Sequence, residues 1–148
     1  MAIGRRVVLS ARFVLSGDSA IKDGCDYDAY RESCFDIEKL EFKADEKPTI
    51  FHIKPLTVEQ RMHMHGVPSA IDGAWFALRC GLEKVDNYLL QDASGNDSAL
   101  PPIVHQSKGD LGRLVSLDWL EQAAFPTDQW IEVAGAISRI SEASRPLS

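Results

Sequence analysis

The stretch KPTIFHIKPLTVEQRMHMHG, from Lys47 to Gly66, sets the expectation for the centre of the fold. Its first part, Thr49 to Lys54, alternates between the two faces of an extended chain, and one face carries Phe51 and Ile53. Pro55 has no N–H group to donate to a sheet, so the strand is expected to end there. The sequence therefore predicts a central strand with one buried face.

A short helix is expected directly after this strand. Thr57 and Gln60 match a capping box, in which the threonine hydroxyl and the glutamine side chain satisfy backbone N–H groups at the helix start. The helix is expected over residues 58–65, with Gly66 ending it in a left-handed conformation. Met62 is expected to pack inward, as part of an amphipathic helix.

The central strand is expected to pair with the segment just before it. Leu40 and Phe42 alternate with charged residues, and residues 44–48 supply a polar turn, which predicts a central β-hairpin within residues 37–56. A further strand is expected near the N-terminus, with a helix as its alternative. One face of that strand is wholly apolar and consists of Val7, Leu9, Ala11 and Phe13.

Most of the remaining chain shows helical patterns. Asp26 is suited to cap a short helix, and Ser69 is suited to cap a longer one. The strongest periodic signal belongs to this longer helix and consists of Ile71, Trp75, Leu78, Leu82, Val85 and Leu89. After a long connection over residues 94–112, two closing helices are expected on either side of Pro126. The expected buried stripe of the last helix is Trp130, Val133, Ala134, Ile137 and Ile140.

These expectations define an α+β protein with an N-terminal strand and a central β-hairpin packed against about four α-helices. The whole chain, 1–148, is assigned to a single domain because its length suits one core and it shows no internal repeat. Residues 1–36 hold the first strand and an acidic polar segment, residues 37–56 the hairpin, and residues 57–148 the helical part with its loop at 94–112.

The composition is that of an ordinary globular protein, with 45% hydrophobic and 26% charged residues. A net charge of −6 argues against a general nucleic-acid-binding surface, which needs clustered Lys and Arg. No segment approaches the roughly 20 apolar residues that span a membrane, and no signal peptide is recognised. The three cysteines are an odd number without CxxC spacing, which favours reduced thiols in the cytoplasm.

The sequence contains no pattern that is typical of catalysis or of metal and cofactor binding. His63 and His65 point about 200° apart on a helix, and the HExxH spacing of zinc helices is absent. Phosphate-binding and nucleophile motifs are also absent, so no catalytic residue, metal site or cofactor is expected. The exposed residues of the central stretch are instead expected to belong to a protein interface: His52, Lys54, Arg61 and His63.

Three stretches of the chain resemble small accessory proteins of tailed bacteriophages, including tail-assembly chaperones. They are Lys47 to Gln60, Ala74 to Asn87 and Leu117 to Ser141, about half the chain, whereas the first 36 residues and residues 94–112 have no counterpart. The resemblance implies a non-enzymatic virion structural or assembly protein. It also implies partners among other virion or assembly proteins or further copies of the chain, in the host cytoplasm during assembly or in the virion.

Two other functions are open at this level. The acidic residues between Asp23 and Asp36 suit an inhibitor or regulator that competes for the basic surface of a host protein. Binding of that kind would depend strongly on salt concentration. A small metal-dependent enzyme is the remaining alternative, and it would carry stoichiometric zinc or iron after purification.

Overall fold

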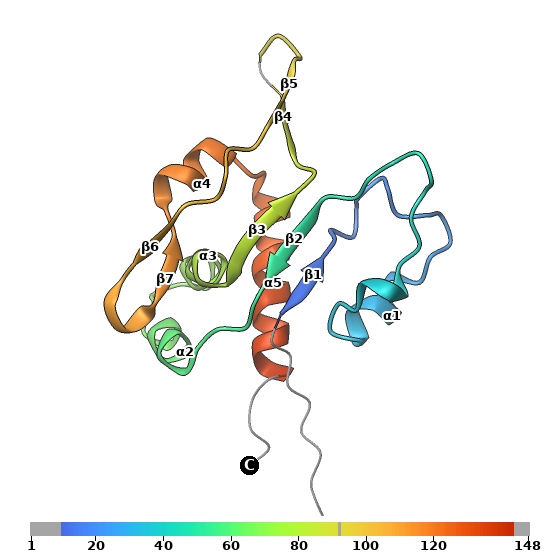
Figure 1. Ribbon diagram of the computed structural model, residues 1–148. Helices are drawn as coiled ribbons and strands as arrows, with labels where there is room; N and C mark the ends of the chain where they lie inside the picture. The colour runs from blue at the N-terminus through green and yellow to red at the C-terminus, as the bar shows by residue number, and fades with distance from the viewer. Residues whose placement is uncertain (1–9, 92, 144–148) are drawn as a thin grey trace, which may run out of the picture.

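The computed structural model describes residues 10–91 and 93–143. Within these residues the protein combines five α-helices with short antiparallel strands, which confirms the expected α+β class. The central sheet has three antiparallel strands in the order β1 (Ala11–Phe13), β2 (Ile50–Ile53) and β3 (Leu82–Asp86) (Figure 1). The strand expected from the opening stretch is therefore the middle strand of this sheet.

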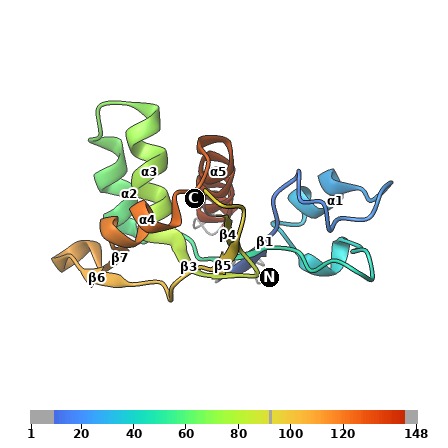
Figure 2. The same ribbon diagram turned by 90° about the horizontal axis from the view of Figure 1, so that it is seen from above.

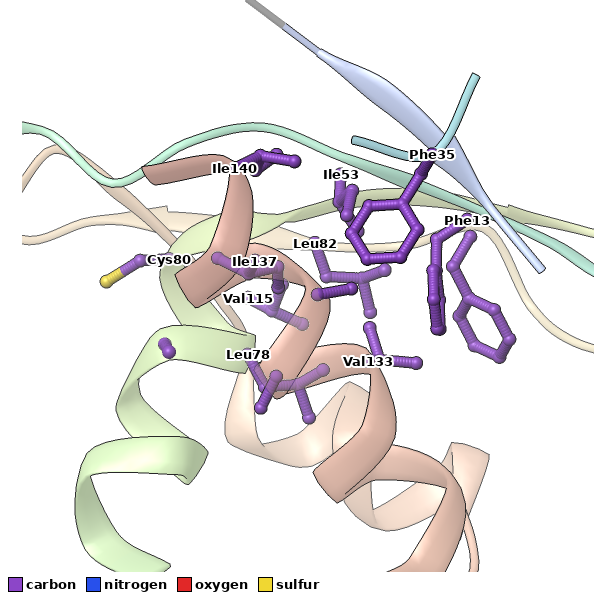
Figure 3. Close-up of a cluster of buried hydrophobic side chains, with 14 of the residues drawn as sticks. Phe13, Phe35, Ile53, Leu78, Cys80, Leu82, Val115, Val133, Ile137 and Ile140 are labelled. Atoms are coloured by element: carbon purple, nitrogen blue, oxygen red, sulfur yellow. The ribbon is translucent and has the colours of Figure 1, made fainter. Parts of the chain in front are cut away.

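Three helices stand on one side of the sheet: α2 (Val58–His65), α3 (Ala70–Gly81) and α5 (Thr127–Ala143) (Figure 2). The buried side chains between these helices and the strands form one continuous hydrophobic cluster. Figure 3 shows the α5 side chains that enter this cluster: Val133, Ile137 and Ile140. The predicted buried stripe of the last helix is thus confirmed for these residues and Ala134, whereas Trp130 is only half-buried and packs edge-on against Trp75.

Alternation along the strands places the large apolar side chains on the helix side. Phe13 of β1 lies opposite Phe51 of β2, and Phe51 lies opposite Val85 of β3. Phe13 and Phe51 are almost fully buried, as the sequence predicted for these faces. Val7 and Leu9, expected on the same face of the first strand, lie outside the described residues.

The predicted hairpin between residues 37 and 56 is wrong. Strand β2 pairs with β1 and β3, while Phe42 makes only an isolated bridge to Ile21 and residues 37–39 form a short 3-10 helix, η1 (Ile37–Lys39). Alternation indicates which face of a strand is buried, but it does not identify the neighbouring strand. The partners that complete the apolar face of β2 come from distant parts of the chain.

The long helix predicted to continue to Leu89 ends at Gly81, and the next five residues form β3. A bulge between His52 and Ile53 of the neighbouring strand shifts the register there. It lets Leu82 and Val85, three residues apart, both contribute to the core. Two buried apolar residues three positions apart are also typical of a helix. The bulged strand was therefore predicted as a continuation of the helix.

The caps predicted at Asp26, Thr57 and Ser69 are confirmed. The Asp26 carboxylate accepts a hydrogen bond from the Ala29 N–H and caps α1 (Tyr27–Glu32). In α2 both bonds of the predicted capping box form, since Thr57 Oγ1 accepts from Gln60 N at 3.2 Å and Gln60 Oε1 accepts from Thr57 N at 2.9 Å. Two other expectations for α2 are wrong. Gly66 has a φ of −92°, outside the left-handed region, and the Met62 side chain is 70% exposed.

The connection predicted to be a loop over residues 94–112 contains regular structure. Two short hairpins and a 3-10 turn occupy most of it and its flanks: β4 (Leu89–Gln91), β5 (Asp97–Ala99), β6 (His105–Ser107), η2 (Gly109–Leu111) and β7 (Arg113–Val115). Helix α4 (Leu117–Ala123) follows and ends at Ala124, which has a left-handed conformation. Ser116 precedes α4 but makes no side-chain capping bond.

Helices α3 and α5 meet where α3 ends, and Gly81 makes this contact possible. A Cβ atom at Gly81 would lie 2.5 Å from Ile137 Cγ2 and 2.9 Å from Ile137 Cγ1, far inside van der Waals contact. Ile137 is fully buried, so it has little room to move away. The position therefore requires glycine for close packing.

We expect Gly81→Ala to lower the free energy of unfolding by about 1–3 kcal/mol, because the added methyl group overpacks the core. Chemical denaturation followed by circular dichroism measures this change. Gly135→Ala in α5 is the matched control, because nothing lies within 4 Å of the position that its methyl group would take. The control should raise stability by about 0.5–1 kcal/mol through helix propensity. Equal effects at the two positions would contradict the packing argument.

Candidate functional site

Figure 2 shows α2, α3 and α5 standing on one side of the central sheet. Two of the four predicted interface residues lie toward the other face, since His52 alternates with the buried Phe51 and Ile53 and Lys54 follows directly after β2. Arg12, His52 and Lys84 form a row across the three strands, since Arg12 pairs with His52 and His52 with Lys84. In the part of the chain that the structure describes, no α-helix covers this side, and the start of η1 borders it beside Arg12 and His52. The alternation seen in the sequence therefore placed His52 correctly on the polar face of β2, and Lys54 follows directly after the strand.

The charges on this bare face are largely paired with one another. Asp86 has contacts with two neighbours, with His52 Nε2 at 2.7 Å and Lys84 Nζ at 3.4 Å. The Lys54 ammonium lies 3.6 Å from a carboxylate oxygen of Glu83. The hydrogen bond with His52, reinforced by Lys84, lowers the pKa of Asp86 below its usual range. The face is thus a polar network rather than a single-sign charged patch.

Asp86→Asn should lower the free energy of unfolding at neutral pH but leave it unchanged in acid. Because folding lowers the pKa of Asp86, its contribution is complete above the unfolded-state pKa of about 3.9 and is lost as pH falls through the lower, folded-state value. Urea unfolding of both proteins at pH 7 and near pH 2 tests this sign. Asp45→Asn, a change at an exposed residue before β2, is the control. A difference between wild type and Asp86→Asn that persists unchanged at low pH would contradict the assignment.

The other two predicted interface residues lie on α2, on the helical side of the protein. Arg61 Nη1 lies 3.5 Å from the Ser141 carbonyl oxygen, which brings Arg61 to the end of α5. His63 is exposed, and its ring packs on Phe76 with centroids 4.5 Å apart. The four residues therefore do not form one surface. The structure divides them between the bare sheet face and the α2 side.

A groove that the sequence did not indicate lies between α5 and the α2–α3 connection. Its volume is about 570 Å³, and its lining includes Val67, Ala70, Gly73, Ile131, Gly135 and Ser138. A smaller cavity of about 120 Å³ shares Met64, His65 and Ser138 with it and is also lined by Arg61. We call this combined feature the α2–α5 groove. Its floor is made of small residues, the apolar side chains of Met64, Val67 and Ile131 border it, and Arg61 and Glu142 lie at one end.

One sequence signal points to this groove in retrospect. Gly135 stands in the middle of a 17-residue helix, where glycine costs about 0.5–1 kcal/mol relative to alanine. A Cβ atom there would contact nothing within 4 Å, so packing inside the described part of the chain does not require the glycine. Ile131, one helical turn earlier, is 42% exposed. The exposure of both positions depends on how the helices pack, which the sequence pattern does not reveal.

The free edge of β1 is closed by a tyrosine side chain. The Tyr30 hydroxyl of α1 donates to the Arg12 carbonyl at 2.6 Å and accepts from the Val14 N–H at 3.0 Å. It thereby occupies two backbone positions that a neighbouring strand would use. Tyr30 is completely buried, and burial raises the pKa of its hydroxyl above the usual range. This edge is therefore protected from strand addition at these two groups.

Tyr30→Phe should lower the free energy of unfolding by about 1–3 kcal/mol, because the buried Val14 N–H and Arg12 carbonyl each lose a partner. Thermal and urea unfolding measure the loss. Tyr88→Phe is the matched control, since the Tyr88 hydroxyl makes a long contact of 3.4 Å with Gln129. The interpretation fails if both variants have the stability of the wild type.

An acidic cavity of about 340 Å³ lies between the segment after β1 and the start of α5. Two of its three acidic residues, Asp18 and Glu132, have structural hydrogen bonds, and Glu132 accepts from Ser16 N and Ser16 Oγ at 2.7 and 3.0 Å. Asp18 accepts bonds from the N–H groups of Ala20 and Thr49, both at 2.9 Å. These contacts join the first segment to α5 and to β2, so we assign the cavity a structural role.

Among the described residues, the titratable groups show no arrangement suited to metal binding. Across residues 10–91 and 93–143, no group of three or more His, Cys, Asp or Glu side chains is placed to hold an ion. The three cysteines are free thiols, and burial raises the pKa of Cys80 to about 12, which makes it a poor nucleophile. Over the same residues, no helix has the length and apolar character required to cross a bilayer.

Comparison with known proteins adds no relative. No protein-family model matches the chain, and neither a curated protein nor a solved structure matches it.

Proposed function

We propose that the chain is a non-enzymatic bacteriophage virion structural or assembly protein that acts through protein–protein contacts. The observation that carries this proposal is the α2–α5 groove, an open apolar feature with no described side chain filling it. Burying apolar surface stabilises a complex by roughly 25 cal/mol per Å². Exposed apolar surface with a polar border is typical of sites where another protein binds.

The residues around the groove suit a protein ligand. Gly135 lacks a side chain, is exposed and has free space where a Cβ atom would lie, so a partner backbone can approach α5 closely. Ile131 offers an exposed apolar contact beside it, and Arg61 offers a positive charge at the far end. Arginine is enriched in protein interfaces relative to the rest of the protein surface. This combination supports protein recognition.

The bacteriophage assignment rests on the resemblance of three stretches of the sequence. These stretches cover β2 with the start of α2, α3 with β3, and α4 with most of α5. They therefore include most of the elements that build the core and the α5 side of the groove, whereas residues 64–73 on its opposite side lie outside them. The shared core elements support a common architecture with an assembly role.

The alternative of an acidic inhibitor receives weaker support. The acidic residues of the segment 23–36 are exposed, which favours the inhibitor alternative: Asp23, Asp26, Asp28, Glu32 and Asp36. Three of them make local structural contacts, however, because Asp26 caps α1, Asp36 caps η1 and Asp28 pairs with Arg31 at 3.1 Å. Acidic groups used in this way explain the composition without an external basic partner.

A photo-crosslinking amino acid at position 131 tests the proposal in cells in which phage particles that contain the gene for this chain are being assembled. We expect position 131 to crosslink to virion or assembly proteins, or to other copies of the chain. The same amino acid at position 118, an exposed site on α4 outside the groove, is the matched control. Crosslinks only to host enzymes, or equal labelling at both positions, would contradict the proposed function.

A further inference from the structure

A two-stranded arm extends from the body of the protein. Strands β4 and β5 pair only with each other, with Leu89 opposite Ala99 and Leu90 opposite Ser98. Figure 1 shows this arm pointing away from the sheet and from α2. The Leu89 side chain is 61% exposed on it. An isolated two-stranded hairpin is only marginally stable in water, so the arm gains from being covered.

We propose that the arm of one copy binds in the α2–α5 groove of the next copy, so that copies join head to tail. This inference rests on the proposed function and names the partner of the groove as a second copy of the chain. The arm points away from its own α2 and α3 (Figure 1), so it meets a groove only on another molecule. One surface then has an apolar projection and the other an apolar recess.

The two surfaces also match in charge. Asp97 is exposed on β5 and forms no ion pair within the described residues. At the end of the groove, Arg61 makes a long hydrogen bond of 3.5 Å to the Ser141 carbonyl. Copies that each carry a net charge of −6 repel one another, so an attractive contact needs a local positive group. Arg61 supplies that group beside the recess, where Glu142 is also part of the lining, and Asp97 supplies its counterpart on the arm.

A contact between two different surfaces of the same chain is heterologous. Every copy in such an assembly has one arm and one groove, so copies add until a ring closes or a filament grows. This geometry predicts a behaviour that a symmetric dimer lacks. A copy with a defective arm still accepts a neighbour, and a copy with a defective groove still donates its arm.

Leu89→Glu disables the arm and Ile131→Glu disables the groove, both at exposed positions where a charged residue is compatible with folding. Size-exclusion chromatography with light scattering gives the absolute mass of the full chain over a range of concentrations. We expect the wild type to form oligomers and each variant alone to be monomeric, with dissociation constants raised tenfold or more. An equimolar mixture of the two variants should form a 1:1 dimer and nothing larger.

Two further sets of variants sharpen the test. Leu117→Glu removes an exposed leucine of α4 outside both surfaces and should leave assembly unchanged. Asp97→Lys and Arg61→Glu should each weaken assembly, and both changes in one chain should restore it. Circular dichroism establishes that every variant is folded.

A wild type that remains monomeric at all concentrations overturns the inference, as does a mixture of Leu89→Glu and Ile131→Glu that fails to dimerise. Neither result touches the proposed function, because crosslinks from position 131 to other assembly proteins would still support it. Oligomers that survive both substitutions also overturn the arm-to-groove contact and indicate an interface elsewhere on the chain.

Discussion

The close contact between Gly81 and Ile137 is the constraint on which the architecture depends. It brings α5 against the end of α3 at the point where the chain changes from helix to strand, and the fully buried Ile137 side chain fills the space that a Cβ atom would take. With α5 fixed there, its apolar side covers the sheet, while its other side remains available. The groove lies on that other side, between α5 and the α2–α3 connection.

Local features of the fold were readable from the sequence, and long-range ones were not. The capping box of α2 and the Asp26 cap of α1 involve residues three apart, so their spacing alone predicted both helix starts. The neighbours of β2 come from segments about 40 residues earlier and 30 residues later, a choice that depends on total burial and not on local pattern. The bulge beside Ile53 then gave β3 an apolar spacing that resembled a helix.

The candidate binding surfaces also divide into one that local sequence predicted and others that depend on long-range packing. The polar side of β2 followed from strand alternation, so the positions of His52 and Lys54 were predictable. The groove and the arm were not, because Gly135 and Ile131 read as part of an ordinary amphipathic helix until the packing of α2 and α3 is known. Leu89 likewise continued an apparent helical stripe, although it is an exposed residue of a hairpin. Exposure is a property of the assembled fold.

The Tyr30 hydroxyl also couples the stability of α1 to a single backbone amide. Val14 follows the edge strand, where an amide normally exchanges its hydrogen with solvent quickly, yet its N–H is held by a side chain from a separate helix. Its exchange rate is then governed by the opening of α1 and not by the opening of the sheet. In a hydrogen–deuterium exchange experiment, this one amide reports the docking of the first third of the chain onto the rest.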